Sequence, residues 1–218
     1  MNAHQHHPGE AWLLDYTLGN LPECFETVIG AHVQVCEHCR ESIAAAEIFG
    51  GELLAGTAAA PLALTPDAIA WRTEADDTPV SPASRAVTVG SRDSFDYFVS
   101  SYLKCSADVL PWKRLGKGLQ ICLLNQQLPY KIWMLRAAPG TVLPRHTHAG
   151  SELTLVMKGA YFCGADIFRA GDIEDADEET LHQPVVTGDS ECICLAVTDG
   201  NLRFEGWLPR LLQPFVGI

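Results

Sequence analysis

The chain has 218 residues, of which 47% are hydrophobic, so it is long enough to bury a core in one large or two small domains. Its formal net charge is −12, and most of the excess acid lies in residues 1–105. That charge disfavours a direct nucleic-acid partner, because phosphates would repel it, and it favours a basic protein partner, although a merely solubilising acidic surface explains it equally well.

Residues 9–54 have the composition of helices, with apolar side chains recurring at helical spacing. So short a helical hairpin cannot bury all of its apolar side chains by itself. We therefore expect a metal ion to hold the hairpin together and a partner to cover the remaining apolar surface. The apolar residues concerned are Leu13, Leu14, Leu18, Phe25, Val28, Ile29, Val33, Ile43, Ile48, Phe49 and Leu53.

A His-x3-Cys-x2-Cys pattern lies within this helical region, formed by His32, Cys36 and Cys39. A helix end and the following turn can bring three such side chains together, and zinc prefers nitrogen and sulfur ligands, four of them in a closed structural site. We predict His7 as the fourth ligand, with His6 as its nearest rival. A redox Cys-x2-Cys pair would follow a strand, and no strand is predicted before this one.

Another hypothesis for the N-terminal histidines is that they form an exposed set in which a neighbour of His7 completes the site. The histidines concerned are His4, His6, His7 and His38.

Residues 56–90 are rich in Ala, Pro, Thr and Asp without a sustained period, and we interpret them as a linker. An additional helix is predicted over residues 92–104, where Phe95, Phe98 and Val99 begin an apolar stripe that continues through Tyr102 and Leu103. Such a stripe is usually part of a core, but here it could equally dock on the first domain or in a partner's groove.

From about residue 110 onward, short β-branched or aromatic runs alternate with glycine-containing turns, a rhythm typical of a β-sandwich or barrel. The cysteines in these runs and shortly before them are interpreted as small core residues, and Cys163 could also be a redox-sensitive thiol, since it is near a histidine-rich motif in sequence. The predicted strands cover 131–136, 152–157, 160–163 and 191–198, and the cysteines are Cys105, Cys122, Cys163, Cys192 and Cys194.

Residues 140–159 fit the pattern Gly-x5-His-x-His-x3-Glu-x6-Gly at every fixed position. Residues two apart on a strand point to the same face, so His146 and His148 can present imidazole nitrogens to one divalent cation, and Glu152 adds a carboxylate. This pattern resembles the first metal-binding motif of the cupin β-barrels.

The cupin family's second motif resembles residues 171–186 in spacing and supplies His182 as the fourth ligand. The turn residues of that motif differ here: Asp177 stands for its proline, Glu179 for its glycine and Val186 for its asparagine. These departures put the geometry of the hairpin in question more than the ligand itself.

The two constellations together resemble the zinc-containing anti-sigma factors of the ChrR type, over nearly the whole chain except the linker. The resemblance implies a multidomain α + β architecture: a small zinc-bound N-terminal helical bundle (1–55), a linker (56–90) and a C-terminal cupin β-barrel of jelly-roll type (106–218). It places zinc on His7, His32, Cys36 and Cys39, and zinc or another divalent metal on His146, His148, Glu152 and His182.

The function implied by this resemblance is sequestration of an extracytoplasmic-function sigma factor by the first domain. The resemblance also implies that the sigma factor is released when the cupin domain responds to a signal such as singlet oxygen or an organic hydroperoxide. No catalytic residues are assigned. Ligand type alone does not choose among zinc, Fe(II), Mn(II) and Ni(II) in the cupin site.

Two other functions fit parts of the sequence. A metal-dependent cupin enzyme such as a dioxygenase would use open coordination positions, with the N-terminal half as an accessory module. A cupin that binds a sugar or another small molecule could regulate transcription without metal chemistry.

The sequence also carries expectations about cellular location. No segment approaches roughly 18 apolar residues in a row, and residues 1–7 contain no basic region followed by an apolar run, so we expect a cytoplasmic protein with no membrane contact. Its eight cysteines are then expected as thiols or metal ligands, because the cytosol keeps thiols reduced.

Overall fold

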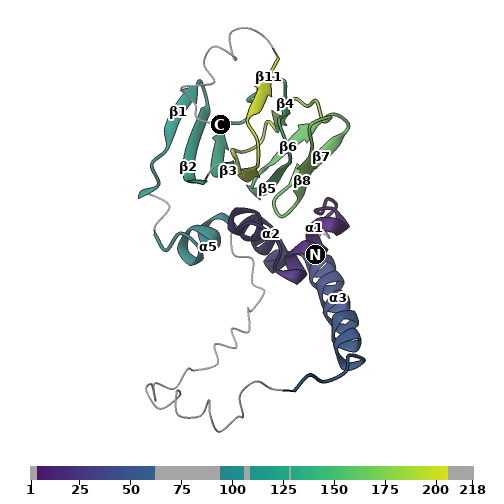
Figure 1. Cartoon of the computed structure of the whole chain (residues 1–218). Coiled ribbons are helices and arrows are strands. Elements are labelled where there is room, and N and C mark those ends of the chain that lie inside the picture. The colour runs from purple at the N-terminus through teal and green to yellow at the C-terminus, as the bar shows by residue number, and fades with distance from the viewer. Residues whose placement is uncertain (1–3, 62–93, 106–108, 128, 206–218) are drawn as a thin grey trace. The chain divides into compact units, whose positions relative to one another are not determined.

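The computed structural model describes residues 4–61, 94–105, 109–127 and 129–205. The helical N-terminal region forms α1 (Glu10–Leu18), α2 (Glu23–Val35) and α3 (Glu37–Ala55), as predicted, and α5 (Ser94–Ser101) follows later in the chain (Figure 1). Among the described helices, none is both long enough and apolar enough to cross a membrane.

Two local features separate the three N-terminal helices. Gly19 follows α1 in the left-handed region at φ 67°, and the N–H groups of Gly19 and Asn20 donate to carbonyl oxygens of the last turn. Cys36 has extended backbone angles between α2 and α3, which breaks the helix at the position where the His-x3-Cys-x2-Cys pattern needs a turn.

The β region follows the helices along the chain (Figure 1). Its strands are β1 (Lys113–Gly116), β2 (Leu119–Gln127), β3 (Tyr130–Ala137), β4 (His146–His148), β5 (Glu152–Lys158), β6 (Ala160–Cys163), β7 (Asp166–Arg169), β8 (Ile173–Ala176), β9 (Val185–Val186), β10 (Cys192–Thr198) and β11 (Leu202–Phe204). They pair in the orders β1-β2-β3-β10-β5-β8, β7-β6-β9 and β11-β4, and every pairing is antiparallel.

The central strands of the six-stranded sheet are buried on both faces. All seven residues of β10 are buried, although side chains alternate between the faces of a strand. Ile193, Leu195 and Val197 belong to one core cluster, whereas Cys192 and Cys194 belong to a second. A sheet with two buried faces needs a cover on each side, and the smaller sheets can cover only one of them.

The other face of the sheet is covered by the N-terminal helices. Phe25, Val28 and Ile29 of α2 share a core cluster with Met134 of β3 and Leu155 of β5. The sheet of the same chain therefore covers the buried face of α2, and the expectation that a partner covers the remaining apolar surface stays a prediction.

Helix α5 joins the same core. Phe95, Phe98 and Val99 are all buried in the cluster that contains α2 and the sheet, and Gln34 of α2 donates a hydrogen bond to the hydroxyl of Tyr102. Of the possibilities open for this apolar stripe, the structure shows burial within the chain.

Of the described residues, those up to Glu47 and those from Ser94 onward belong to one compact unit, and residues 48–61 belong to another. Residues 62–90 of the segment interpreted as a linker lie outside the described residues, and the boundaries 1–55, 56–90 and 106–218 stay a prediction.

Replacement of Ile29 by alanine tests the shared core. Ile29 is fully buried, so Ile29→Ala should lower the free energy of unfolding by about 2–5 kcal/mol in urea unfolding. The matched control is Ile48→Ala in α3, which is 69% exposed and should change stability by no more than about 0.5 kcal/mol. Equal effects of the two changes would contradict the packing described here.

Candidate metal centres

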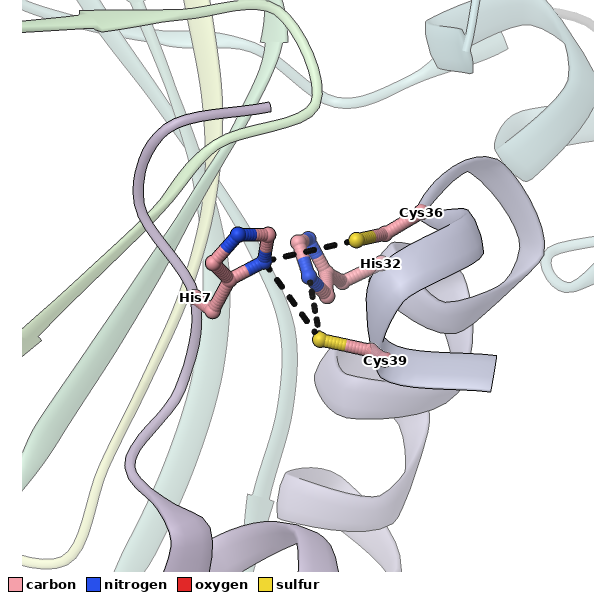
Figure 2. Close-up of side chains that lie close together, drawn as sticks. All are labelled: His7, His32, Cys36 and Cys39. Carbon is pink, nitrogen blue, oxygen red and sulfur yellow. Dashed lines mark hydrogen bonds between the residues drawn. The ribbon is translucent and has the colours of Figure 1, made fainter. Parts of the chain in front are cut away.

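Four of the predicted ligands meet in the N-terminal region. His7 comes from the segment before α1, His32 from the last turn of α2, Cys36 from the break between helices and Cys39 from the first turn of α3 (Figure 2). One possible ligand atom from each of the four side chains lies within 4.8 Å of all the others. The short helix break thus brings both thiols to the two imidazoles.

The distances within this cluster suit a tetrahedral cation. His7 Nδ1 lies 3.3 Å from Cys36 Sγ and 3.5 Å from Cys39 Sγ, and His32 Nε2 lies 3.2 Å from Cys39 Sγ. Tetrahedral zinc with its usual bond lengths would set nitrogen and sulfur ligands about 3.6 Å apart. The cluster could close around such an ion with shifts of a few tenths of an ångström.

The β region orients one of these histidines. His32 Nδ1 lies 2.7 Å from the backbone carbonyl oxygen of Gly171, so Nδ1 carries the proton and donates it there. The lone pair of His32 is then on Nε2, which faces Cys39. A hydrogen bond of this kind from the non-ligating nitrogen is typical of histidines that bind metals.

Burial favours the neutral forms of this cluster when no cation is bound. It lowers the pKa of His32 to about 4, and it also lowers the pKa of His7. Burial, with Cys36 beside it, raises the pKa of Cys39 to about 12. Both imidazoles are thus ready to bind a cation, whereas the thiol of Cys39 would release its proton only when a cation arrives.

The neighbouring histidines have other contacts. The ring of His6 packs on Phe168, with 4.2 Å between ring centroids, and His4 Nε2 lies 3.2 Å from the carbonyl oxygen of Val35. His38 lies beside His7, with 4.7 Å between ring centroids, but outside the cluster. The structure therefore brings His7, and not its rival His6, to the two cysteines.

A second group of four predicted ligands meets in the β region, where one candidate ligand atom from each side chain lies within 4.8 Å of the rest. His146 and His148 are the two ends of the three-residue strand β4, and both are buried. Glu152 is the first residue of β5. His182 pairs with His146 through two backbone hydrogen bonds, and the Nε2 atoms of His146 and His148 each lie 3.0 Å from its Nε2.

Hydrogen bonds on the far side of these rings place lone pairs opposite each other. His146 Nδ1 lies 2.8 Å from the carbonyl oxygen of Pro144, and His182 Nδ1 lies 2.8 Å from a carboxylate oxygen of Glu174. Because these oxygens only accept, each Nδ1 carries a proton, and when both rings are neutral the two Nε2 lone pairs face one another. A cation between them would turn this repulsion into coordination.

Two buried polar atoms of this group also have no hydrogen-bond partner among the described residues, namely Glu152 Oε2 and His148 Nδ1, which lie 3.4 Å apart. Buried polar atoms are rarely left unpaired, and a cation near the carboxylate would account for the free oxygen. The three imidazoles and one carboxylate thus fit a divalent metal, although ligand type does not choose which one.

Sequence analysis missed the residues that support His182. Glu174 of β8 accepts a hydrogen bond from His182 Nδ1 and another from the hydroxyl of Tyr161. These contacts, together with the positive charge that His182 can carry, lower the pKa of Glu174 although burial opposes them. In the sequence Glu174 is one of several acidic residues between Asp172 and Glu179, and no local signal distinguishes it from its neighbours.

Cys163 lies on the other side of Glu174, within 4.8 Å of the carboxylate and of His182. Burial and the nearby carboxylate raise the pKa of its thiol well above the ordinary value. Since the thiolate is the reactive form, this shift disfavours the hypothesis that Cys163 is a redox-sensitive thiol.

Side-chain hydrogen bonds of Asp177 fix the altered turn before His182. Asp177 accepts hydrogen bonds at Oδ1 from the backbone N–H groups of Glu179 and Thr180 and from the hydroxyl of Thr180. Aspartate can fix a turn in this way without proline or glycine. The departures from the second motif therefore leave His182 in place.

A cavity of about 240 Å³ opens beside the second cluster. Its walls are mostly apolar and include Trp133, Leu135 and Phe204, while His146, Glu152 and His182 provide polar groups. Concave apolar sites with a few converging polar groups commonly hold small ligands.

Acid should destabilise the metal-free protein through His32. The unfolded chain takes up this proton near pH 6.5, but the folded chain resists it until about pH 4, so the unfolded state binds more protons between these values. The contribution of His32 to the free energy of unfolding is fully present above about pH 6.5. It falls by up to roughly 3 kcal/mol as the pH approaches 4.

Urea unfolding of chelator-treated protein at pH 7 and pH 4.5 measures this loss. Replacement His32→Gln removes the titrating group, so the stability of the variant should fall less over the same interval. Equal losses in both proteins would contradict the assignment.

The comparisons with known proteins agree with this architecture. A family model described as the ChrR cupin-like domain matches residues 101–202. The anti-sigma-E factor ChrR of Cereibacter sphaeroides is 38% identical over 220 residues, which cover 98% of this chain and 99% of that protein.

Among solved structures, the crystal structure of Rhodobacter sphaeroides SigE in complex with the anti-sigma ChrR contains a chain with a TM-score of 0.72 and 32% identity, over 90% of this chain and 100% of that chain. An RmlC-like cupin protein from Ralstonia eutropha has a TM-score of 0.42 and 18% identity, over 46% of this chain and 70% of that chain. With a helical N-terminal region that carries a His/Cys cluster and a cupin-like β domain after it, the chain belongs to the ChrR family of anti-sigma factors.

Proposed function

We propose that this protein binds an extracytoplasmic-function sigma factor through its N-terminal helices and keeps it from RNA polymerase. The observation that carries the proposal is the 38% identity with an anti-sigma-E factor over nearly the full length of both chains. The similar solved structure is of that kind of protein in complex with SigE. Inhibition would be by occlusion, and the complex would form in the cytoplasm, where RNA polymerase works.

Exposed apolar side chains on the helices support a protein partner. On α1, Leu14 is 52% exposed and Leu18 is 61% exposed, one helical turn apart on the same side. Near the end of α3, Ile48, Phe49 and Leu53 are each at least 60% exposed. Exposed apolar residues that lie together on a helix commonly mark an interaction surface.

The charge of the helices supports a basic partner. Acidic residues outnumber basic ones in α1 to α3, where Arg40 is the basic residue and the acidic residues are Glu10, Asp15, Glu23, Glu26, Glu37, Glu41, Glu47 and Glu52. Such a surface would attract the basic surface of a DNA-binding sigma factor and speed association.

We assign zinc to the N-terminal cluster, because two imidazoles and two thiols form the closed donor set typical of structural zinc. The ion would hold the break between α2 and α3 and the segment before α1 in one arrangement. For the cluster of His146, His148, Glu152 and His182 we propose zinc or another divalent metal in a sensory role. Release of the sigma factor would follow singlet oxygen or an organic hydroperoxide, as the family resemblance implies.

The apolar cavity beside the second cluster favours one other function, that of a metal-dependent cupin enzyme such as a dioxygenase. Kinship with an anti-sigma factor over nearly the full length argues against it. Iron-loaded protein with steady turnover of a substrate, together with failure to bind a sigma factor, would establish the enzyme instead.

Removal of the thiols should abolish inhibition. Cys36→Ser with Cys39→Ser removes two of the four donors, and metal binding at such a site is coupled to folding. The double variant should lose the N-terminal metal and at least tenfold in affinity for the sigma factor, measured by in vitro transcription and by pull-down. Cys24→Ser, a half-buried thiol of α2 outside the cluster, is the matched control. An inhibitor that survives the double change would contradict the model.

Changes in the second cluster should separate binding from signalling. His146→Ala should remove metal from the cupin site while sigma-factor affinity stays within about threefold, and the response to hydroperoxide should be lost. The measurement is sigma-dependent transcription before and after exposure to the oxidant. Loss of sigma binding in unstressed protein would instead show that the cupin site is part of the inhibitory clamp.

A further inference from the structure

Strand β8, together with the turn before it, touches both clusters. The carbonyl oxygen of Gly171 accepts the hydrogen bond from His32 of the N-terminal cluster, at 2.7 Å. Three residues later, the carboxylate of Glu174 accepts the hydrogen bond from His182 of the cupin cluster, at 2.8 Å. One short stretch of chain thus orients a candidate ligand in each site.

The turn also holds the segment that carries His7. The backbone N–H of Ile173 donates to the carbonyl oxygen of His6 at 3.1 Å. Asp172 Oδ1 accepts from the backbone N–H groups of Gln5 at 3.0 Å and of His6 at 3.5 Å. Since His7 is the next residue, its position depends on this turn as well as on the two cysteines.

A third anchor lies on β8 itself. Asp175 accepts hydrogen bonds from the backbone N–H of Gly9 at 3.1 Å and from the indole N–H of Trp12 at 3.2 Å. Neighbouring residues of a strand point to opposite faces, so Asp175 holds the N-terminal segment while Glu174 faces the cupin cluster.

The fit at Gly171 leaves little room for adjustment. Its φ is +97°, and a Cβ atom at this position would lie 2.0 Å from Cε1 of His4. The backbone of the turn is therefore in direct contact with the N-terminal segment.

On the cupin side, β8 also contacts the strand that provides the carboxylate ligand. Glu152 is directly opposite Ala176 in the antiparallel pairing of β5 with β8, and Thr154 is opposite Glu174. The second oxygen of Glu174 is occupied by the hydroxyl of Tyr161. A displacement of His182 or Glu152 is therefore transmitted to β8, because closely packed interiors transmit small displacements.

From these contacts we infer that β8 couples the two clusters: Glu174 senses the state of the cupin cluster, and Gly171, Asp172 and Asp175 pass it to His32 and His7. The biological meaning of this coupling rests on the proposed function, for which it supplies the route from the sensory site to the helices that bind the sigma factor. The coupling itself is a property of the single chain.

Cobalt titration of the metal-free full-length protein tests the inference. All proteins in this test carry Cys163→Ser, because the thiol of Cys163 lies near His182 and could also bind cobalt. Thiolate-to-cobalt charge-transfer absorption then reports the N-terminal cluster, since the cluster of His146, His148, Glu152 and His182 has no thiol. Glu174→Gln weakens the bond to His182 and touches no residue of the N-terminal cluster. It should still weaken cobalt binding there by about fivefold or more, the usual size of coupling between sites. An N-terminal affinity within twofold of the parent protein would overturn the inference.

Three further variants exclude a general loss of structure. Tyr161→Phe removes only one donor to Glu174 and should shift the N-terminal affinity in the same direction. Asp189→Ala removes an exposed carboxylate outside the β8 contacts and should leave the affinity unchanged. Gly171→Ala should weaken binding more than Gly164→Ala, because both glycines have positive φ but only Gly171 has a neighbour within reach of an added Cβ.

A double-mutant cycle locates the route. Asp175→Ala detaches Gly9 and Trp12 from β8, so Glu174→Gln should have little further effect in its presence. Additive effects of the two changes would mean that β8 does not carry the coupling. None of these measurements involves a sigma factor, so a failed coupling leaves the anti-sigma function standing, and a failed sigma interaction leaves the coupling standing.

Discussion

The hydrogen bond from His32 to the carbonyl oxygen of Gly171 is the interaction on which much of the structure depends. It leaves Nε2 of His32 free to face Cys39, and it ties the end of α2 to the turn before β8. The same turn holds the segment of His7 through Asp172 and Ile173, so one short turn orients both imidazoles of the N-terminal cluster. The cluster is therefore built by the helical region and the β region together.

The hydrophobic core is also built by the helical region and the β region together. Phe25, Val28 and Ile29 of α2 pack with alternate residues of the central strands, which explains why β10 is apolar along its whole length. A cupin-like sheet with water on its outer face would carry polar residues there. Burial of α2 leaves α1 and the end of α3 as the exposed apolar surfaces for a partner, while the inner face of the sheet lines the cavity beside the second cluster.

Spacing in the sequence was enough to predict the helices, the main strands and most members of both groups, because His-x-His on a strand and Cys-x2-Cys at a helix end have few geometric solutions. The prediction of His182 came from the resemblance to the cupin family. Spacing did not reveal the groups that orient these candidate ligands. The carbonyl of Gly171 has no side chain to recognise, and Glu174 acts through a tertiary contact. The substitution of Asp177 for proline looked disruptive because side-chain hydrogen bonds that fix a turn are not visible in a motif. Burial of α2 on the sheet depends on packing between distant segments, which periodicity alone does not define.

The central claim is that one chain joins a sigma-binding helical region to a metal-binding cupin domain. Co-expression with a candidate extracytoplasmic-function sigma factor, followed by size-exclusion chromatography and metal analysis of the eluted complex, tests it most directly. We expect stable co-elution with about two metal ions per chain, at least one of them zinc. A protein that elutes without the sigma factor and carries iron alone would contradict it.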